Sequence, residues 1–297
     1  MFEIKTLTKR NIKVFLRDRV AVFFSFLSVI ILMALYILFI GKQYQQGMEM
    51  VDAKLRTFLI TSQMMGGVLI INTISLSLGI MGNIVNDIDQ KLIEGFLVTP
   101  VKRYKIILSY FLSSVIVTVT LTMLMWVITI LYIGISSGYW FNTLEILSVS
   151  GIITLSTFIS ASVMILVTTV IKSINAFGAV SGVLGTFIGF STGIYMPLHI
   201  LGTAMKHFAS LLPFTHLAII LKRVMLARPL KLLYESMATV EQRDQIMAEV
   251  KNAYGYNEIG IVGQHVSMWI ILTTFLVISM IFLFLALRKM IKRIQKT

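Results

Sequence analysis

Runs of apolar residues alternate with short polar stretches along the whole chain. A helix of about 20 predominantly apolar residues is long enough to cross the hydrocarbon core of a bilayer. By this measure the sequence predicts six transmembrane helices, at residues 20–40, 57–82, 106–135, 144–171, 174–196 and 265–287. We therefore expect an all-α polytopic membrane protein in which residues 1–297 form a single transmembrane domain.

The N-terminal segment, residues 2–19, mixes apolar side chains with six Lys or Arg residues. This pattern predicts an amphipathic helix that lies in the headgroup layer at the membrane interface. A plain positively charged flank of the first span fits the same residues equally well. Both interpretations place the segment on the cytoplasmic side.

The longest segment between predicted spans covers residues 197–264. Its first part, residues 197–230, is too apolar for a solvated loop, and Pro197, Gly202 and Pro213 interrupt it. Short re-entrant helices in the outer leaflet, with their broken backbone covered by protein, fit this composition best.

The second part of that segment, residues 239–254, predicts a surface helix. Thr239 with Gln242 has the pattern of a capping box, and Gly255 is suited to end the helix. We expect a small external cap with a structural role rather than a dedicated binding domain.

Composition supports the membrane assignment. Hydrophobic residues make up 57% of the chain and charged residues 13%, with a mean hydropathy of +0.88, whereas soluble domains carry about 25% charged residues. Sixteen of the 26 Lys and Arg residues fall in the N-terminus, in residues 83–105, at position 172 and in the C-terminal tail. The positive-inside rule then places both termini in the cytoplasm, and we expect a bacterial plasma membrane. The net charge of +13 therefore indicates membrane topology and no nucleic-acid partner.

Several kinds of chemistry are missing from the sequence. Apart from Glu145 at the very start of the fourth, no Asp, Glu, Lys or Arg falls within a predicted span, which argues against an ion-coupled transporter, although backbone-coordinated sodium sites remain open. There is no G-x-x-x-x-G-K-[ST] phosphate loop, no H-E-x-x-H and no cysteine. The histidines are better interpreted as interfacial polar residues than as metal ligands: His199, His207, His216 and His265. We therefore expect no catalytic, cofactor or metal site in this chain.

Small residues recur every four positions in the fifth predicted span, at Ser181, Gly185, Gly189 and Gly193. This spacing forms a groove that another helix backbone approaches closely. Packing within the chain, a subunit interface and a mobile gate all remain open as its use. Together with Pro197, these are the candidate helix-packing or gate residues.

Two motifs resemble those of the type-2 ABC exporter permease family, in particular its drug-resistance-type membrane subunits. The family typically shows G-T-L-E-x-L-L-x-T-P-[VL]-x-R in the cytoplasm after its second span. The matching positions here are Glu94, Leu97, Thr99, Pro100, Val101 and Arg103. Lys91 and Leu92 stand where the family usually has Gly and Thr.

The second motif follows the fifth span. The family shows Gly, then Pro, a Leu-Pro pair and a later Asn-Pro before a helix. Gly193 and Pro197 match, whereas Leu201-Gly202 replaces Leu-Pro and Leu212-Pro213 replaces Asn-Pro.

The resemblance implies that residues 83–105 form a cytoplasmic coupling segment that docks on an ATPase subunit. Its acidic side chains are suited to basic partner residues, its apolar ones offer a docking face, and Pro100 ends the helix. The implied contact residues are Asp87, Asp89, Leu92, Ile93, Glu94, Phe96, Leu97, Thr99, Pro100 and Arg103. A solvated helical hairpin without a partner is the alternative.

The resemblance also implies the partners: two cytoplasmic ABC ATPases, which bind ATP and Mg, and a second permease copy or a similar permease. Residues 2–19 resemble the family's connecting helix, which lies on the membrane beside the ATPase. The expected function is outward movement of an amphipathic drug, antimicrobial peptide or lipid-like molecule. The candidate path residues are Tyr36, Asn72 and Phe190. The alternatives are a polysaccharide, teichoic-acid or lipid-linked glycan exporter and a non-transporting toxin-sensing or immunity protein.

Overall fold

The computed structural model describes residues 2–20, 22–23, 26–27, 51–195, 198, 200–237, 243–256 and 266–294. Its helices are α1 (Phe2–Arg17), α4 (Ala53–Asp89), α5 (Leu92–Leu97), α6 (Arg103–Ser137), α7 (Thr143–Thr168), α8 (Ile174–Ser191), α9 (Thr203–Ser210), α10 (Pro213–Ser236), α11 (Arg243–Ala253) and α12 (Met268–Ile294). Tyr36, Pro197 and nearly all of the first predicted span lie outside the described residues.

Five helices of the described chain are long and apolar enough to cross a membrane: α4, α6, α7, α8 and α12. They coincide with predicted spans two to six, and the protein is therefore an all-α polytopic membrane protein, as the sequence predicts. Helices α9 and α10 meet at a bend of 87°, which is the geometry of a broken span or a re-entrant loop.

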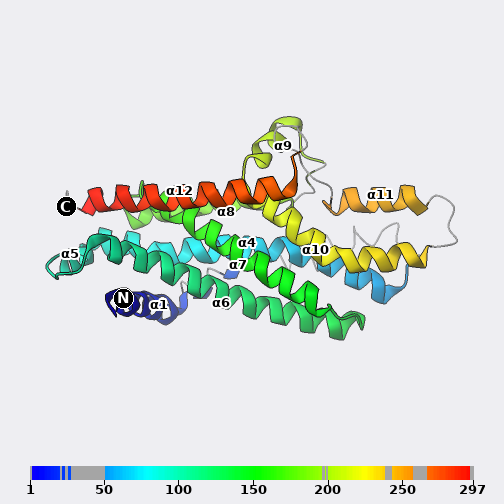
Figure 1. Ribbon diagram of the computed structural model, residues 1–297, viewed down its shortest axis with the longest axis horizontal. Coiled ribbons are helices and arrows are strands. Elements are labelled where there is room, and N and C mark those ends of the chain that lie inside the picture. Colours follow the sequence, from blue (N-terminus) through cyan, green and yellow to red (C-terminus); the bar gives the residue numbers. More distant parts are fainter. Residues whose placement is uncertain are drawn as a thin grey trace.

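The bundle is elongated, and its two ends differ (Figure 1). Helices α1 and α5 and the C-terminal end of α12 lie at one end, here called the terminal end, and α11 lies at the other, the distal end. Helix α4 is the central element. In an apolar 18-residue stretch of α4, 83% of the residues are buried, whereas the corresponding shares are 33% in α6 and 17% in α8. Helix α4 packs on α6, α7 and α10.

Hydroxyl and amide side chains join α4 to its neighbours. Asn72 Nδ2 donates to Thr122 Oγ1 of α6 at 3.0 Å, and Thr73 Oγ1 lies 3.2 Å from Ser160 Oγ of α7. Small polar residues of this kind let membrane helices approach closely and bond to one another. Asn72 is therefore fully buried between two helices, and in this conformation it does not line an open path.

Helix boundaries depart from the sequence prediction at the polar flanks. The second span was expected to end at Gly82, but α4 continues to Asp89. The third was expected to begin at Ile106, but α6 begins at Arg103. The polar connection between the two long helices is therefore shorter than the predicted 83–105 segment and covers residues 90–102. We call residues 90–102 the α5 connection.

Residues 213–236 form one 24-residue helix, α10, which is longer than the short helices expected there, while its bend against α9 is compatible with the expected re-entrant arrangement. Pro213 stands in the first turn, where its missing N–H costs no hydrogen bond. His216 is buried, and its Nε2 lies 2.7 Å from the Ser210 carbonyl oxygen, which holds α9 to α10 across the bend. The preceding helix, α9, has the short length expected of a re-entrant element.

The distal end carries its own apolar cluster. Its buried members come from α4, α10 and the α11 region: Leu55, Leu59, Leu226, Leu230, Leu233, Met237, Met247 and Tyr254. The expected surface helix is present as α11, and Gly255 follows it with φ of 64°, a conformation that glycine adopts without steric cost. The Thr239–Gln242 capping box lies outside the described residues.

Candidate functional site

The α5 connection is a compact turn between α4 and α6. Lys91 precedes α5 with φ of 58°, the only positive φ at a non-glycine residue in the described chain. Thr99 Oγ1 donates to the Phe96 carbonyl oxygen at 2.6 Å and closes the C-terminal end of α5. Pro100 follows, and α6 begins three residues later. Lys91 stands where the family motif has glycine, which is the residue that adopts this left-handed conformation at the least steric cost.

The side chains of α5 divide into an inner and an outer set. Ile93 is buried at 4% exposure, and Phe96 and Leu97 are half-buried against the main core. The outer set consists of Leu92 at 48% exposure, Glu94, Val98, Thr99 and Pro100. The outer set is the surface that a partner can touch.

Asp87 is not part of that outer surface, contrary to its assignment as a docking residue. It is 2% exposed, and its carboxylate accepts hydrogen bonds from the Tyr110 hydroxyl and from the Arg10 guanidinium, including Arg10 Nη2 at 3.3 Å. Because these partners neutralise and desolvate the carboxylate together, α4 can remain helical and buried through its polar end. Its role in the structure is to hold α1 and α6 to α4.

Arg10 links four helices at this end. Besides Asp87, its Nη1 lies 3.4 Å from the Tyr110 hydroxyl, and its guanidinium carbon lies 5.4 Å from the centre of the Phe96 ring in α5. Burial alone would lower the pKa of Arg10, but the hydrogen bond with Asp87 and the negative charge of Asp87 leave it above its ordinary value. The cation is therefore permanent. We call Arg10, Asp87, Tyr110 and Phe96 the Arg10 cluster.

Two further contacts hold α1 along α6. Asn11 Nδ2 donates to Ser109 Oγ at 3.2 Å, and Lys105 pairs with Glu3. Phe15, at 1% exposure, packs against the α4–α6 surface. The predicted amphipathic helix is therefore present and is bound to the bundle over three turns. The sequence indicated its amphipathic pattern but not these partners.

The remaining predicted docking residues lie at the edge of the α5 connection. Asp89 is exposed and accepts a hydrogen bond from the Ile174 backbone N–H at 3.3 Å, which ties the end of α4 to the start of α8. Arg103 is half-buried at the start of α6. Both are therefore close to the outer set, though Asp89 already has a partner within the chain.

The small-residue stripe of α8 has two different environments. A side chain added at Gly189 would overlap the Tyr195 ring, and Gly193 has φ of 68° in the turn that follows the helix. Nothing lies within 4 Å of a Cβ built at Gly182 or Gly185, and both are exposed. The C-terminal part of the stripe, from Gly189, is thus used for packing within the chain. The N-terminal part, here called the lower part, is uncovered among the described residues. Ser181, in the lower part, bonds to the Phe177 carbonyl oxygen at 2.7 Å.

Lys222 of α10 is a buried cation that sequence reasoning missed. It is 2% exposed, and its Nζ donates to the Thr192 carbonyl oxygen at the end of α8 at 3.4 Å. A Cβ at Gly66 would lie 3.0 Å from its Cγ, so the small residues of α4 make room for it. The clue in the sequence was a lysine within a segment too apolar to be a loop.

The other path residue that the structure describes, Phe190, is 37% exposed and packs edge-on against Tyr195 with ring centres 5.3 Å apart. It is partly exposed beside the packed part of α8, whereas Asn72 lies inside the bundle.

Comparison with known proteins is consistent with this geometry. No curated protein matches the chain. The family model described as ABC-2 type transporter matches residues 2–226, a range that includes α1, the Arg10 cluster, the α5 connection and the start of α10. Since the matched range covers most of the chain, the protein belongs to the ABC-2 type transporter family and is its membrane-spanning permease component.

Proposed function

We propose that this permease exports an amphipathic compound, such as a drug, an antimicrobial peptide or a lipid-like molecule, with energy from separate ATPase subunits. The observation that carries the proposal is the α5 connection, where exposed Leu92 and Glu94 stand on a short helix joined to α4, α6 and α1. Permeases of this family normally work with ATPase partners, and ATP and Mg bind on those partners.

The coupling argument follows from the Arg10 cluster. A push on α5 reaches Phe96, whose ring contacts Arg10, and Arg10 bonds to Asp87 at the end of α4. Tyr110 of α6 bonds to the same carboxylate. A displacement of α5 therefore acts on α1, α4 and α6 together, which is what a domain needs if remote ATP hydrolysis is to rearrange its spans.

The orientation supports energy input from the cytoplasmic side. The terminal end carries α1, α5 and the end of α12, and the Lys and Arg residues of these segments favour the cytoplasmic side. We propose two permease copies, or this chain with a similar permease, and two ATPases. The uncovered part of the α8 stripe, around Gly182 and Gly185, offers a surface for the second permease.

The test is the substitution Glu94→Lys, measured on the ATPase that co-purifies with the wild-type chain in mild detergent. Reversing an exposed charge at a docking surface weakens the complex through like-charge contacts, and we expect at least about a tenfold loss of co-purification. Export of the compounds that stimulate the ATPase should fall with it.

The matched control is Glu249→Lys, the same change at an exposed position of α11 at the distal end. It should leave both readouts unchanged. Wild-type co-purification and export in Glu94→Lys, at equal expression, would rule out the docking role of α5.

A further inference from the structure

The outer side of α1 is a line of positive charge. Lys5, Lys9, Lys13 and Arg17 follow one another at intervals of four, and all are exposed. The opposite side of the helix, with Thr8, Asn11 and Phe15, is buried against the bundle. Like charges at this spacing lie next to each other on a helix and repel. We call these four residues the outer basic face of α1.

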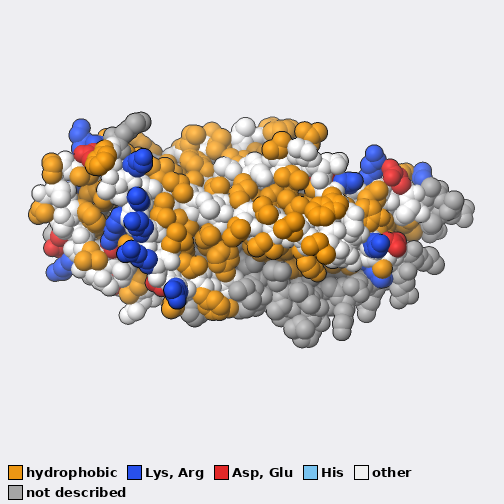
Figure 2. Space-filling model, turned by 90° about the horizontal axis from the view of Figure 1, so that it is seen from below, with side chains coloured by type: hydrophobic (Ala, Val, Ile, Leu, Met, Phe, Trp, Pro, Cys, Tyr) orange, Lys and Arg blue, Asp and Glu red, His pale blue; other side chains and the backbone are white. Residues whose placement is uncertain are grey.

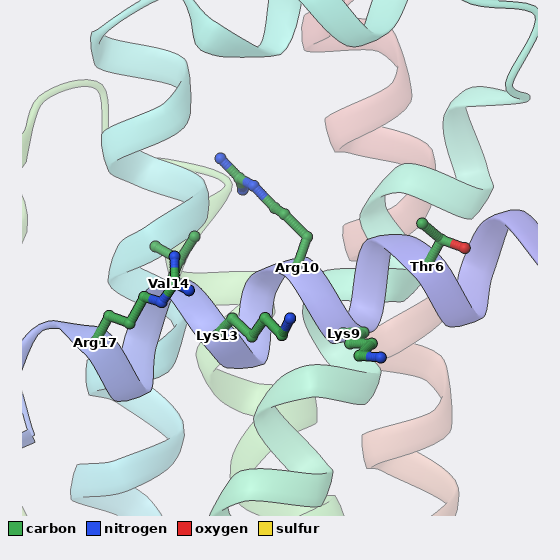
Figure 3. A pocket seen from close by; sticks show the side chains of 6 residues that line it. All are labelled: Thr6, Lys9, Arg10, Lys13, Val14 and Arg17. Carbon is green, nitrogen blue, oxygen red and sulfur yellow. The ribbon is translucent and has the colours of Figure 1, made fainter.

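A hollow of about 390 Å³ opens along this face. It is lined by Thr6, Lys9, Arg10, Lys13, Val14 and Arg17, with no Asp or Glu among them. Figure 3 shows Lys9, Lys13 and Arg17 along the helix, with the Arg10 side chain extended away from them, and Arg10 is paired with Asp87. The acidic residue of α1, Glu3, is paired with Lys105. The three outer cations thus share a concave surface that suits a negatively charged group.

The surroundings of the hollow are apolar. Val14 lines it at 38% exposure, and Phe2 and Leu16 of the same helix are 82% and 49% exposed. Figure 2 shows Lys and Arg side chains in a band across the terminal end, directly beside the broad apolar surface of the bundle. A ligand that fits this place carries an anionic group next to hydrocarbon.

From this juxtaposition we propose that the outer basic face of α1 binds the phosphate headgroup of an anionic phospholipid, with the acyl chains along the apolar surface beside it. A soluble anion would gain nothing from contact with the exposed apolar side chains of Val14 and Leu16, whereas an acyl chain would be buried against them. An ATPase subunit, in the function proposed above, approaches the α5 connection, which is a different surface of the terminal end. The bound lipid compensates the repulsion along the face and, because α1 also carries Arg10, stabilises the helix that touches α5.

The experiment measures lipid binding to the full-length chain in detergent by native mass spectrometry. The probes are phosphatidylglycerol and phosphatidylcholine with identical acyl chains, and inorganic phosphate as a separate competitor. The variant is Lys9→Gln/Lys13→Gln/Arg17→Gln. The control, Lys206→Gln/Lys231→Gln/Lys251→Gln, removes the same charge away from α1.

The wild-type chain and the control should retain phosphatidylglycerol over phosphatidylcholine, and the α1 variant should bind phosphatidylglycerol on the order of a hundredfold more weakly. The charge-conserving variant Lys9→Arg/Lys13→Arg/Arg17→Lys should keep the preference. A thermal melt of each variant shows that the fold is retained, since none of the three changed side chains is buried.

Three outcomes would overturn the proposal. Equal binding of the two lipids by the wild-type chain would show that the negative charge of the headgroup is not recognised. Displacement of phosphatidylglycerol by millimolar inorganic phosphate would indicate a free-anion site. Unchanged lipid binding in the α1 variant, with loss of the co-purifying ATPase, would assign the face to a protein. The Glu94→Lys test concerns another surface, so the two proposals fail independently.

Discussion

The Arg10 guanidinium in α1 donates hydrogen bonds to the carboxylate of Asp87 in α4, 77 positions farther along the sequence. The carboxylate is 2% exposed, and the Tyr110 hydroxyl of α6 donates to it as well. Three helices thus depend on one buried charge. This explains why the polar end of α4 stays in the bundle, and why α1 is more than a flank of the first span.

Arg10→Met tests this relationship. The substitution leaves the buried Asp87 carboxylate with the Tyr110 hydroxyl as its remaining contact within the described chain. Removing one partner of a buried ion pair costs about 3 kcal/mol or more, so we expect a fall of that order in the free energy of unfolding in detergent. Proteolysis should also cut α1 from the bundle sooner.

Lys9→Met is the control, because Lys9 lies on the exposed side of the same helix. It should change the unfolding free energy by less than about 0.5 kcal/mol. Adding Asp87→Asn to Arg10→Met should recover part of the loss, since a buried amide costs less than a buried carboxylate. If Arg10→Met and Lys9→Met had the same free energy of unfolding, the Arg10–Asp87 pair would not contribute to stability.

Lys91→Gly should stabilise the protein. Lys91 has φ of 58°, a conformation that costs an ordinary L-residue about 1–2 kcal/mol and glycine almost nothing sterically. Glycine loses more backbone entropy on folding, so the net gain should be at most about 1 kcal/mol. The measurement is the unfolding free energy in detergent, and Lys91→Val should change it in the opposite direction.

The matched control is Lys102→Gly. Lys102 is an exposed lysine of the same connection, but its φ is −64°, so glycine relieves no backbone strain there. The entropic cost of glycine and its preference for the N-cap position of α6 oppose each other, and the unfolding free energy should change by less than about 0.5 kcal/mol. A gain in Lys102→Gly equal to that in Lys91→Gly would show that loss of the lysine, and not the backbone conformation, is responsible.

Hydropathy was enough to find spans two to six, because a long apolar helix satisfies its own backbone hydrogen bonds and can bury its side chains in the bilayer. It was not enough to find their ends. Residues 83–89 read as polar loop, yet they are helical, since Asp87 receives its partners from α1 and α6. No local pattern reveals partners so distant in the sequence.

The same limit explains α10. Pro197, Gly202 and Pro213 interrupt residues 197–230, so the sequence predicts short re-entrant helices there, although residues 213–236 form one continuous helix. In the structure Arg223 bonds to the Tyr256 carbonyl oxygen at 2.6 Å, and Arg228 bonds to the loop before α7. Each cation finds a backbone acceptor that only the tertiary fold provides. The sequence predicts Leu92 and Glu94 as docking residues, and both are exposed on α5, but it does not single out Arg10, Tyr110 or Lys222.

Lys222→Met should separate stability from function. The substitution removes a buried charge and keeps most of the side-chain volume beside Gly66, so the unfolding free energy should be unchanged or higher. Ionisable residues buried in membrane domains are usually functional, so substrate-stimulated ATPase activity of the complex should fall several-fold. Both quantities are measured on the same preparation. A loss of stability above about 2 kcal/mol would instead mean that the ammonium mainly caps α8 through Thr192.

The last prediction concerns the two parts of the α8 stripe. Gly189→Ala should lower the unfolding free energy by about 1–3 kcal/mol, because the added methyl group overlaps the Tyr195 ring. Gly182→Ala should leave it unchanged or raise it by up to about 1 kcal/mol, since the methyl group meets open space and alanine favours the helix.

A larger residue at the open position then distinguishes a subunit interface from a bare helix face. Gly182→Leu keeps the single chain intact, because nothing lies within 4 Å of its Cβ. If a second permease packs closely on this part of α8, the leucine prevents that approach, and cross-linking or light scattering should show a loss of dimer. Ala176→Leu, at an exposed position on another side of α8, is the control for added bulk. If both variants dimerise like the wild type, the second copy binds elsewhere.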